Sequence, residues 1–323
     1  MDPVRLARPP SRAALAAAVL AGVFASSPSG AAGGATEVPF PPVPTEAQYG
    51  RAAQALADPL NKPITGAAEL PAIIGGERPA SLEALQATRR GDRAENGLEA
   101  GRAEALSAAG RAYGAQGGLA ARSFAINEML RRNEAQLDGA YDFRALVLPA
   151  GTGQTLLKPP VVTEAQMAFA LGEGGQVARE TSCIYQVTRA AELTSAPPNW
   201  RSYLVRGWDT PMRPSENGLP ANRAEVAYWN KSVAEGWADG EKQAVEIFLS
   251  DLGRLQTDIV GMARYRVLLR AGLVEQPRVA FQNRRVEGGR DTMRVGDTTI
   301  RITDQPGLQP NTRRWTPTGP CAR

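Results

Sequence analysis

The clearest hydrophobic pattern in this sequence lies between residues 222 and 271. Apolar residues recur there at spacings of three, four and seven, the spacing of one helix face. They are Trp229, Val233, Trp237, Ala244, Phe248, Leu252, Leu255, Ile259 and Met262. Asn222, with Glu225 three residues later, can cap the start of such a helix, and Gly272 can end it in the left-handed conformation. The pattern therefore predicts a helix that runs from Asn222 nearly to Ala271.

Four glycines interrupt this predicted helix. Gly236, Gly240, Gly253 and Gly261 should each weaken it by about 1 kcal/mol relative to alanine. They indicate close helix crossings or a kink rather than a ligand site.

A second amphipathic helix is predicted after Gly114. Leu119, Ile126, Leu130 and Leu137 fall on one stripe. The other face is predicted to carry Arg122, Arg131, Arg132 and Glu134. The segment then turns at a Tyr141-Asp142-Phe143 corner into a short strand over Leu146–Leu148. This pattern on its own indicates packing and no function.

Near the end of the chain, the sequence predicts a β-hairpin. The stretches TMRV and TTIRIT flank Gly296-Asp297, which is typical of a two-residue turn. Because an isolated hairpin is barely stable, we expect it to dock on the helices, pair with the Leu146–Leu148 strand, or add to a partner's sheet. The predicted fold class is α+β and predominantly helical, with amphipathic helices packed against a small β element.

The N-terminal part reads as an export signal followed by a linker. An arginine-bearing start precedes an apolar run from Ala13 to Ala25 and then small residues, with cleavage expected after Ala25 or near Ala31 and Ala32. The run is shorter than the ~20 residues that a transmembrane helix needs. From Ala32 to about Pro79 the proline density favours an extended tether, either an ordinary linker or a docking strand, apart from a short helix over 45–58 capped by Thr45.

These elements predict four segments. They are a cleavable signal peptide (1–32), a Pro/Ala/Gly-rich and partly linker segment (33–104), a helical core (105–281), and a C-terminal hairpin with a tail (282–323).

Composition argues against catalysis and against nucleic-acid binding. The sequence contains no histidine, which removes the commonest general base and the commonest metal ligand. We therefore expect no catalytic residue, no cofactor and no metal. The Gly-containing stretches 151–158 and 172–175 are interpreted as loops, and Asp138 with Asp142 as a solvated helix end. The net charge of +4 falls further once the leader is removed, so no direct nucleic-acid binding is expected.

Two sets of side chains are candidates for interaction or cross-linking. Trp200, Tyr203 and Trp208 lie in a proline-containing stretch and are either interface anchors or residues that cover the core under a loop. Cys183 and Cys321 can form a disulfide in an exported protein. The alternative is that Cys183, in a predicted helix, simply fills core space.

Several longer segments resemble one known family. They are GAQGGLAARSFAINEMLRRNEAQLDGAYDFRALVL (114–148), APPNWRSYL (196–204), EVAYWNKSVAEGWADGEKQAVEIF (225–248) and GMARYRVLLRAGLV (261–274). Together they resemble the DotC family, called TraI in IncI-type conjugation systems, of the type IVB secretion apparatus.

The resemblance implies a non-enzymatic component of the outer-membrane core complex, in the periplasm, which assembles in many copies with DotD-like and DotH-like subunits. Family members carry a lipid-modified cysteine directly after the apolar run. This sequence has none there, so we expect attachment to the outer membrane through partner subunits. The alternative is a periplasmic enzyme acting on cell wall or a solute-binding protein, which predicts a deep pocket with perturbed carboxylates.

Overall fold

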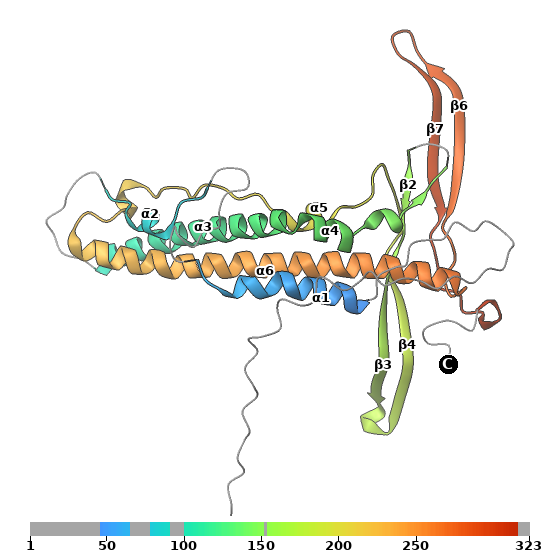
Figure 1. The fold of residues 1–323 in the computed structure, drawn as a ribbon, viewed down its shortest axis with the longest axis horizontal. Helices are drawn as coiled ribbons and strands as arrows, with labels where there is room; N and C mark the ends of the chain where they lie inside the picture. The colour runs from blue at the N-terminus through green and yellow to red at the C-terminus, as the bar shows by residue number, and fades with distance from the viewer. Residues whose placement is uncertain (1–45, 65–77, 91–99, 152–153, 316–323) are drawn as a thin grey trace, which may run out of the picture. The chain divides into compact units, whose positions relative to one another are not determined.

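Helices α3 (Ala100–Arg132) and α6 (Arg223–Arg270) lie side by side along their length and form the body of the protein. The computed structural model describes residues 46–64, 78–90, 100–151 and 154–315. The two helices run in the same direction, since Gly110 lies against Trp229 and Gly118 against Trp237 (Figure 1). The predicted fold class, α+β and rich in helix, is confirmed.

Helix α6 begins and ends where the sequence predicts. The Asn222 side chain accepts a hydrogen bond from the Glu225 amide over 2.9 Å, and this bond satisfies an amide that the first turn leaves unpaired. Gly272 follows the last residues with a φ of 73°. Only glycine adopts this left-handed conformation without a steric cost.

Glycines set the separation of the two long helices. A Cβ atom on Gly114 or Gly118 of α3 would overlap the backbone carbonyls of Val233 and Trp237 in α6. Gly236 and Gly240 of α6 are placed in the same way against the backbone of α3. Helix α6 is continuous through its glycines. The interpretation that glycines permit a close helix crossing is therefore confirmed at Gly236 and Gly240.

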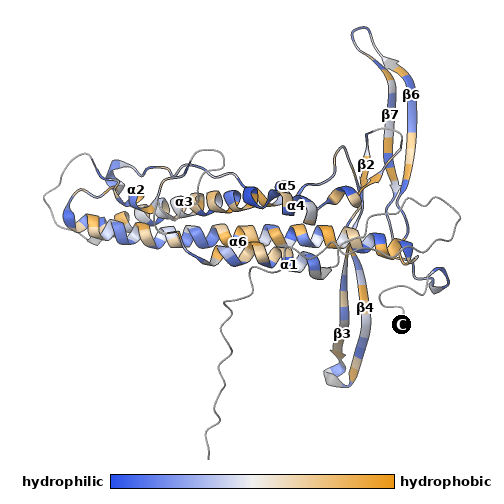
Figure 2. Ribbon diagram, in the orientation of Figure 1, coloured by the Kyte–Doolittle hydropathy of each residue, from blue (hydrophilic) through white to orange (hydrophobic). Residues whose placement is uncertain are grey.

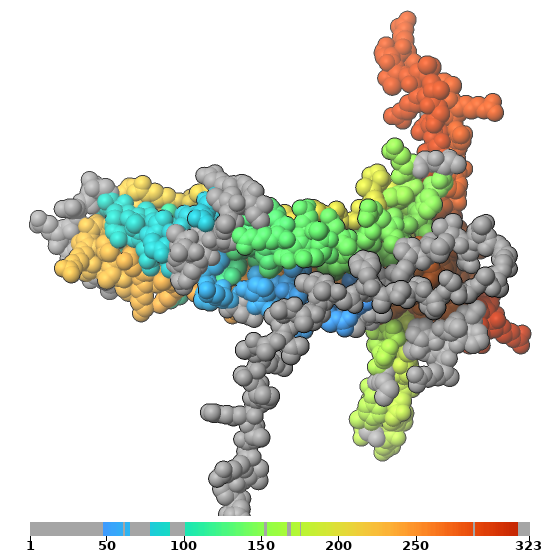
Figure 3. Space-filling view, viewed as in Figure 1, coloured from blue at the N-terminus to red at the C-terminus, as the bar shows by residue number. Residues whose placement is uncertain are grey.

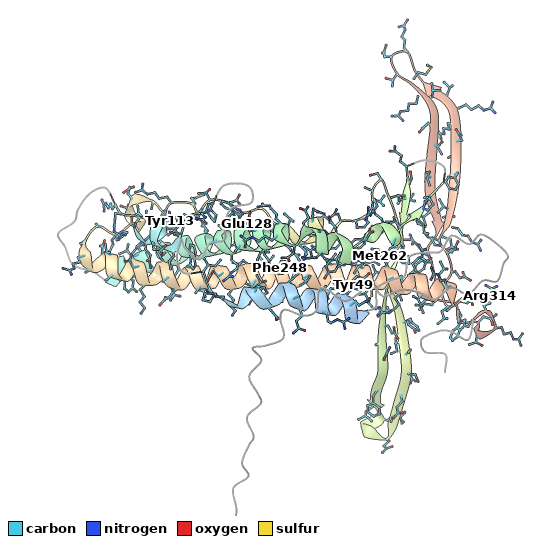
Figure 4. The ribbon with its side chains drawn as sticks, viewed as in Figure 1. Tyr49, Tyr113, Glu128, Phe248, Met262 and Arg314 are labelled. Atoms are coloured by element: carbon cyan, nitrogen blue, oxygen red, sulfur yellow. The ribbon has the colours of Figure 1, made fainter. Side chains whose placement is uncertain are left out.

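The short helix α1 (Glu46–Ala57) packs against α6 in the opposite direction. The Gln256 side chain donates to the Tyr49 carbonyl, and Glu241 accepts from the Ile64 amide. Figure 4 labels Tyr49 on α1 and Phe248 and Met262 on α6, which are buried in one apolar cluster. The helix predicted over 45–58 is therefore present and belongs to the body. Its predicted cap, Thr45, lies outside the described residues.

Between α3 and α6 the chain turns, forms small sheets and then returns along α3. Asn127 donates to the Arg206 carbonyl, Gln116 accepts from the Met212 amide, and Arg102 donates to the Leu219 carbonyl, so residues 206–219 run antiparallel to α3. The other short elements of the described chain are η1 (Asp58–Asn61), α2 (Leu82–Gln86), α4 (Glu134–Ala140), η3 (Phe143–Ala145), β1 (Leu148–Pro149), β2 (Leu156–Lys158), β5 (Glu192–Thr194), α5 (Trp200–Leu204), η5 (Glu216–Gly218) and η6 (Thr312–Arg314).

The corner predicted at Tyr141 is present, and the short strand after it begins at Leu148, two residues later than predicted. The Asp142 side chain accepts from the Arg144 amide and starts η3, and Leu148 then pairs with Leu157 in the antiparallel sheet β1-β2-β5. The stretch 172–175 is also a turn, as the sequence predicts, and forms η4 (Glu173–Gly175).

Two long hairpins leave the helical body (Figure 1). The first pairs β3 (Val161–Gly172) with β4 (Val177–Arg189), and the second pairs β6 (Arg278–Gly288) with β7 (Met293–Asp304). The C-terminal hairpin is confirmed, but its predicted turn is wrong because Gly296 and Asp297 lie inside β7 and the chain reverses over residues 289–292. The reversal starts at Gly289, directly after Gly288 ends β6, and the Gly289 amide donates to the Thr292 carbonyl over 2.9 Å.

Three other predictions are wrong. The stretch 151–158, interpreted as a loop, ends in strand β2, which pairs with β1 and β5. Cys183 lies on strand β4, not on a helix, because its segment pairs residue by residue with β3. Arg122 was expected on the polar face of its helix but is buried, with an exposed fraction of 5%. Its guanidinium donates to Glu241 over 3.0 Å and to the Lys62 carbonyl, so a long-range ion pair overrides the helical pattern.

Candidate functional site

The aromatic residues Trp200, Tyr203 and Trp208 face the interior in large part. Trp200 has an exposed fraction of 3%, and its ring N–H donates to Asp138 over 2.7 Å. The Tyr203 hydroxyl donates to buried Asp258 over 2.8 Å, while Trp208 meets Phe124 edge to face. All three cover the apolar clusters of the body, and this leaves Trp208 and Tyr203 only partly available to another molecule.

Charged groups surround the end of α4 next to Trp200. Hydrogen bonds from Arg201 and Trp200 lower the pKa of Asp138, and hydrogen bonds from Arg144 lower the pKa of Asp142. Both shifts favour the ionised carboxylate. A general acid needs the opposite shift, so the geometry here suits ion pairing between α4 and α5.

A groove of about 470 Å³ lies between α3, α6 and the returning segment. Apolar side chains such as Leu119, Ile126 and Phe248 line much of it. The side-chain amides in this groove already bind residues 206–219, the segment that returns along α3. Asn127 donates to the Arg206 carbonyl, and Gln116 accepts from the Met212 amide. Among the described residues, no cluster of three acidic or cysteine side chains is placed to hold a metal ion.

The β3–β4 hairpin exposes an apolar face that the sequence interpretation missed. Opposite residues of an antiparallel pair share a face, and residues alternate between faces along each strand. The register pairs Phe169 with Glu180 and Ala165 with Ile184, which puts them on one face together with Leu171. The exposed fractions are 58% for Phe169, 64% for Leu171 and 44% for Ile184. We call this set, Phe169, Leu171, Glu180 and Ile184, the β3–β4 outward face.

The opposite face of the same hairpin docks on α6 at its base. Val162 is fully buried there, Tyr185 and Val187 pack on the same cluster, and Arg264 of α6 bonds to Glu164 over 3.0 Å. Gly261 leaves room for the side chain of Val161. The hairpin is therefore anchored through one face, and its outward face is left open to solvent.

The β6–β7 hairpin has the same organisation. Its base packs through Ile302 on the cluster of Ala150, Leu157 and Ala191, and Gln305 exchanges hydrogen bonds with the Ala191 backbone. On the other face, Val286 pairs with Val295, and Met293 comes next toward the turn. Their exposed fractions are 61%, 69% and 69%.

Charged residues lie on this face of β6–β7 beside the apolar ones. Arg284 pairs with Asp297, and Arg301 lies opposite Ala280. We call the set Arg284, Val286, Met293, Val295, Asp297 and Arg301 the β6–β7 outward face. Figure 2 shows apolar bands on the strands of both hairpins, and Figure 3 shows the red β6–β7 hairpin standing clear of the helices.

The predicted disulfide would join a described residue, Cys183, to one outside the described part of the chain. Cys183 is half-buried on β4. Cys321 lies outside the described residues, so the disulfide remains a prediction. No helix in the described ranges is long and apolar enough to cross a membrane.

The fold and its surfaces define a class of protein: a helix-rich α+β body that carries two hairpins with uncovered apolar faces. The model of one family, described as a type IV secretory system family of conjugal DNA–protein transfer, matches residues 100–317, about two thirds of the chain. The chain belongs to this TraI family of type IV secretion. No curated protein matches it.

Proposed function

We propose that this protein is a non-enzymatic structural component of the outer-membrane core complex in a type IVB secretion or conjugation apparatus. It is exported to the periplasm, associates with the outer membrane through partner subunits, and helps to assemble or localise the ring. DotD-like and DotH-like subunits are the expected partners. Membership of the TraI family supports a role in a type IV secretion machine. The resemblance of several segments to DotC supports a place in the outer-membrane core complex of that machine.

The observation that carries the structural role is the uncovered apolar surface of the hairpins. Phe169, Leu171, Val286, Met293 and Val295 are all more than half exposed. Several exposed apolar side chains on one face of a hairpin are typical of a protein–protein interaction site. Both hairpins are held at their bases by buried contacts, and these faces lie outside those contacts.

The alternative of an enzyme or a solute-binding protein predicts a deep pocket with perturbed carboxylates. The pKa values of Asp138 and Asp142 are perturbed, but hydrogen bonds from Arg201 and Arg144 lower them, and these bonds join segments of the chain itself. The groove beside α3 uses its amides to hold the protein's own backbone. The interaction role therefore has the stronger support.

Purification from the native host tests this proposal. Tagged protein is extracted in mild detergent, and the co-purifying proteins are identified by mass spectrometry. We expect other secretion-system core subunits with the wild type and fewer of them with the double variant Phe169→Ser, Leu171→Ser. A variant of a partly exposed helix position away from the hairpins, Glu235→Ala, is the matched control and should retain them. Recovery of the wild type as a lone periplasmic monomer would contradict the proposal.

A further inference from the structure

We infer that the β3–β4 outward face of one copy of this protein packs on the β6–β7 outward face of a neighbouring copy. The inference rests on the proposed function, since it names the contact that would link copies within the ring. It follows from three properties of the two faces: their apolar content, their charge and their position on the chain.

The apolar residues of the two faces match in kind and in place. Phe169 and Leu171 lie in the last positions of β3 before its turn, and Val286 lies in the same part of β6. A two-stranded hairpin with an open apolar face is marginal by itself, and a second β layer about 10 Å away would cover it. Stacking the two faces would form a small two-layer β structure with its apolar residues inside.

Charge favours the pairing of a β3–β4 outward face with a β6–β7 outward face over the pairing of two identical faces. Glu180 is the charged residue of the β3–β4 outward face. The β6–β7 outward face carries Arg284 and Arg301 with Asp297, so its net charge is positive. Packing two β3–β4 faces would oppose two faces that each carry a negative charge, and packing two β6–β7 faces would oppose two faces of net positive charge. Like charges opposed in an interface cost free energy, so each face favours the other as its partner.

The position of the faces determines what the contact builds. Because they are different surfaces of one chain, the contact is head-to-tail, and each copy has both a donor and an acceptor surface. Head-to-tail contacts form rings when their rotation closes and filaments when it does not. A pairing of identical surfaces would stop at a dimer.

Mixing two disrupted variants tests the head-to-tail arrangement. One variant carries Phe169→Ser with Leu171→Ser, and the other carries Val286→Ser, Met293→Ser and Val295→Ser. Each should lose self-association by about tenfold or more, equivalent to at least ~1.4 kcal/mol. When mixed, they should form a one-to-one dimer and nothing larger, because each contributes its one intact face. Sedimentation velocity on the purified full chains measures the masses, and circular dichroism verifies that both variants fold.

Each other outcome overturns the inference. These outcomes are a wild type that stays monomeric, single variants that still associate, a mixture that remains monomeric, or a wild type that stops at a dimer. If the mixture stays monomeric while secretion subunits still co-purify from the host, the faces bind another subunit and the proposed function stands. If those subunits are also missing, the proposed function fails together with the inferred contact between copies.

Discussion

The paired helices α3 and α6 and the two hairpins use their residues in opposite ways. In the helical pair, small residues lie where the helices touch, so that Gly114 and Gly240 bring backbone against backbone and Trp229 and Trp237 are buried beside them. In the hairpins, large apolar residues such as Phe169 and Met293 stand in solvent. The helical pair buries most of its large apolar side chains within the chain, whereas the outward faces of the hairpins leave theirs more than 40% exposed.

This difference separates stability from interaction. Removing a buried group leaves a cavity or an unpaired charge, which costs several kcal/mol, while changing an exposed side chain costs ~0.5 kcal/mol or less. Substitutions in the helices should therefore alter unfolding, and substitutions in the hairpin faces should alter assembly alone. The following predictions test this separation, beginning with the largest expected loss of stability.

Removal of Glu241 should have the largest effect. Glu241 and Arg122 form an ion pair with exposed side-chain fractions of 7% and 6%, and Glu241 also accepts from the Ile64 amide. The substitution Glu241→Ala leaves a buried guanidinium without its carboxylate, which costs about 3–5 kcal/mol. Chemical denaturation measures the loss. The matched control is Glu235→Ala, which breaks an exposed pair with Arg111 and should cost at most ~1 kcal/mol.

Two glycines of α6 provide a sharper comparison within one helix. Alanine at Gly240 would overlap the Ala115 backbone of α3, whereas Gly253 has nothing within 4 Å of the added atom. Gly240→Ala should destabilise the protein by about 3 kcal/mol because α3 and α6 must separate. Gly253→Ala should stabilise it by ~0.5–1 kcal/mol through helix propensity. Equal effects at the two positions would show that the crossing does not depend on Gly240.

Helix α6 could be predicted closely because its information is local. The apolar spacing, the Asn222 cap and the Gly272 end all lie within the segment, and each agrees with the others. The burial of Arg122 depends on Glu241, 119 residues away, so no local pattern could reveal it. The same applies to α1, whose packing on α6 joins distant segments.

The β3–β4 hairpin was missed although a signal was present. Val161, Val162, Thr181, Ile184 and Val187 are β-branched residues on either side of the glycine-containing turn at 172–175. Alanine, glutamate and leucine between them are good helix formers, which favoured the helix interpretation around Cys183. The C-terminal hairpin was found, but Gly296-Asp297 competed with Gly288-Gly289 for the turn, and only the register decides between them. The outward faces depend on this register, so they could not be derived from the sequence.

Acid should weaken both ends of the helical body through their carboxylates, Asp138 on α4 and Glu225 in the first turn of α6. Hydrogen bonds lower the pKa of Asp138 in the folded state, so its stabilising contribution is complete above the unfolded value of about 3.9 and is lost as the pH falls through the lower folded value. Burial acts to raise the pKa of Glu225, but hydrogen bonds from Arg102 and the Ala221 amide outweigh it and lower the pKa. The stabilising contribution of Glu225 is therefore also lost as the pH falls. The melting temperature should therefore stay level above pH ~5 and fall below pH ~4.

The substitution Asp138→Asn tests how much of the loss of stability in acid comes from the Asp138 carboxylate. It removes the charge that Arg201 holds, so the variant should melt lower than the wild type at pH 7 and lose less on acidification. A melting temperature with the same pH dependence in both proteins would assign the acid sensitivity to other groups.

The smallest expected change in stability comes from the hairpin faces, and it is the most informative. Phe169 and Leu171 are 58% and 64% exposed, so replacing both with serine should shift the free energy of unfolding by less than ~1 kcal/mol. The matched variant at the base of the hairpin, Val162→Ser, removes a fully buried side chain and should cost ~3 kcal/mol. If the outward pair proved as costly as Val162, those side chains would be packing within their own chain, and the hairpin would no longer be an uncovered surface. A near-neutral change in unfolding, together with lost association, would instead assign these residues to contact with another molecule.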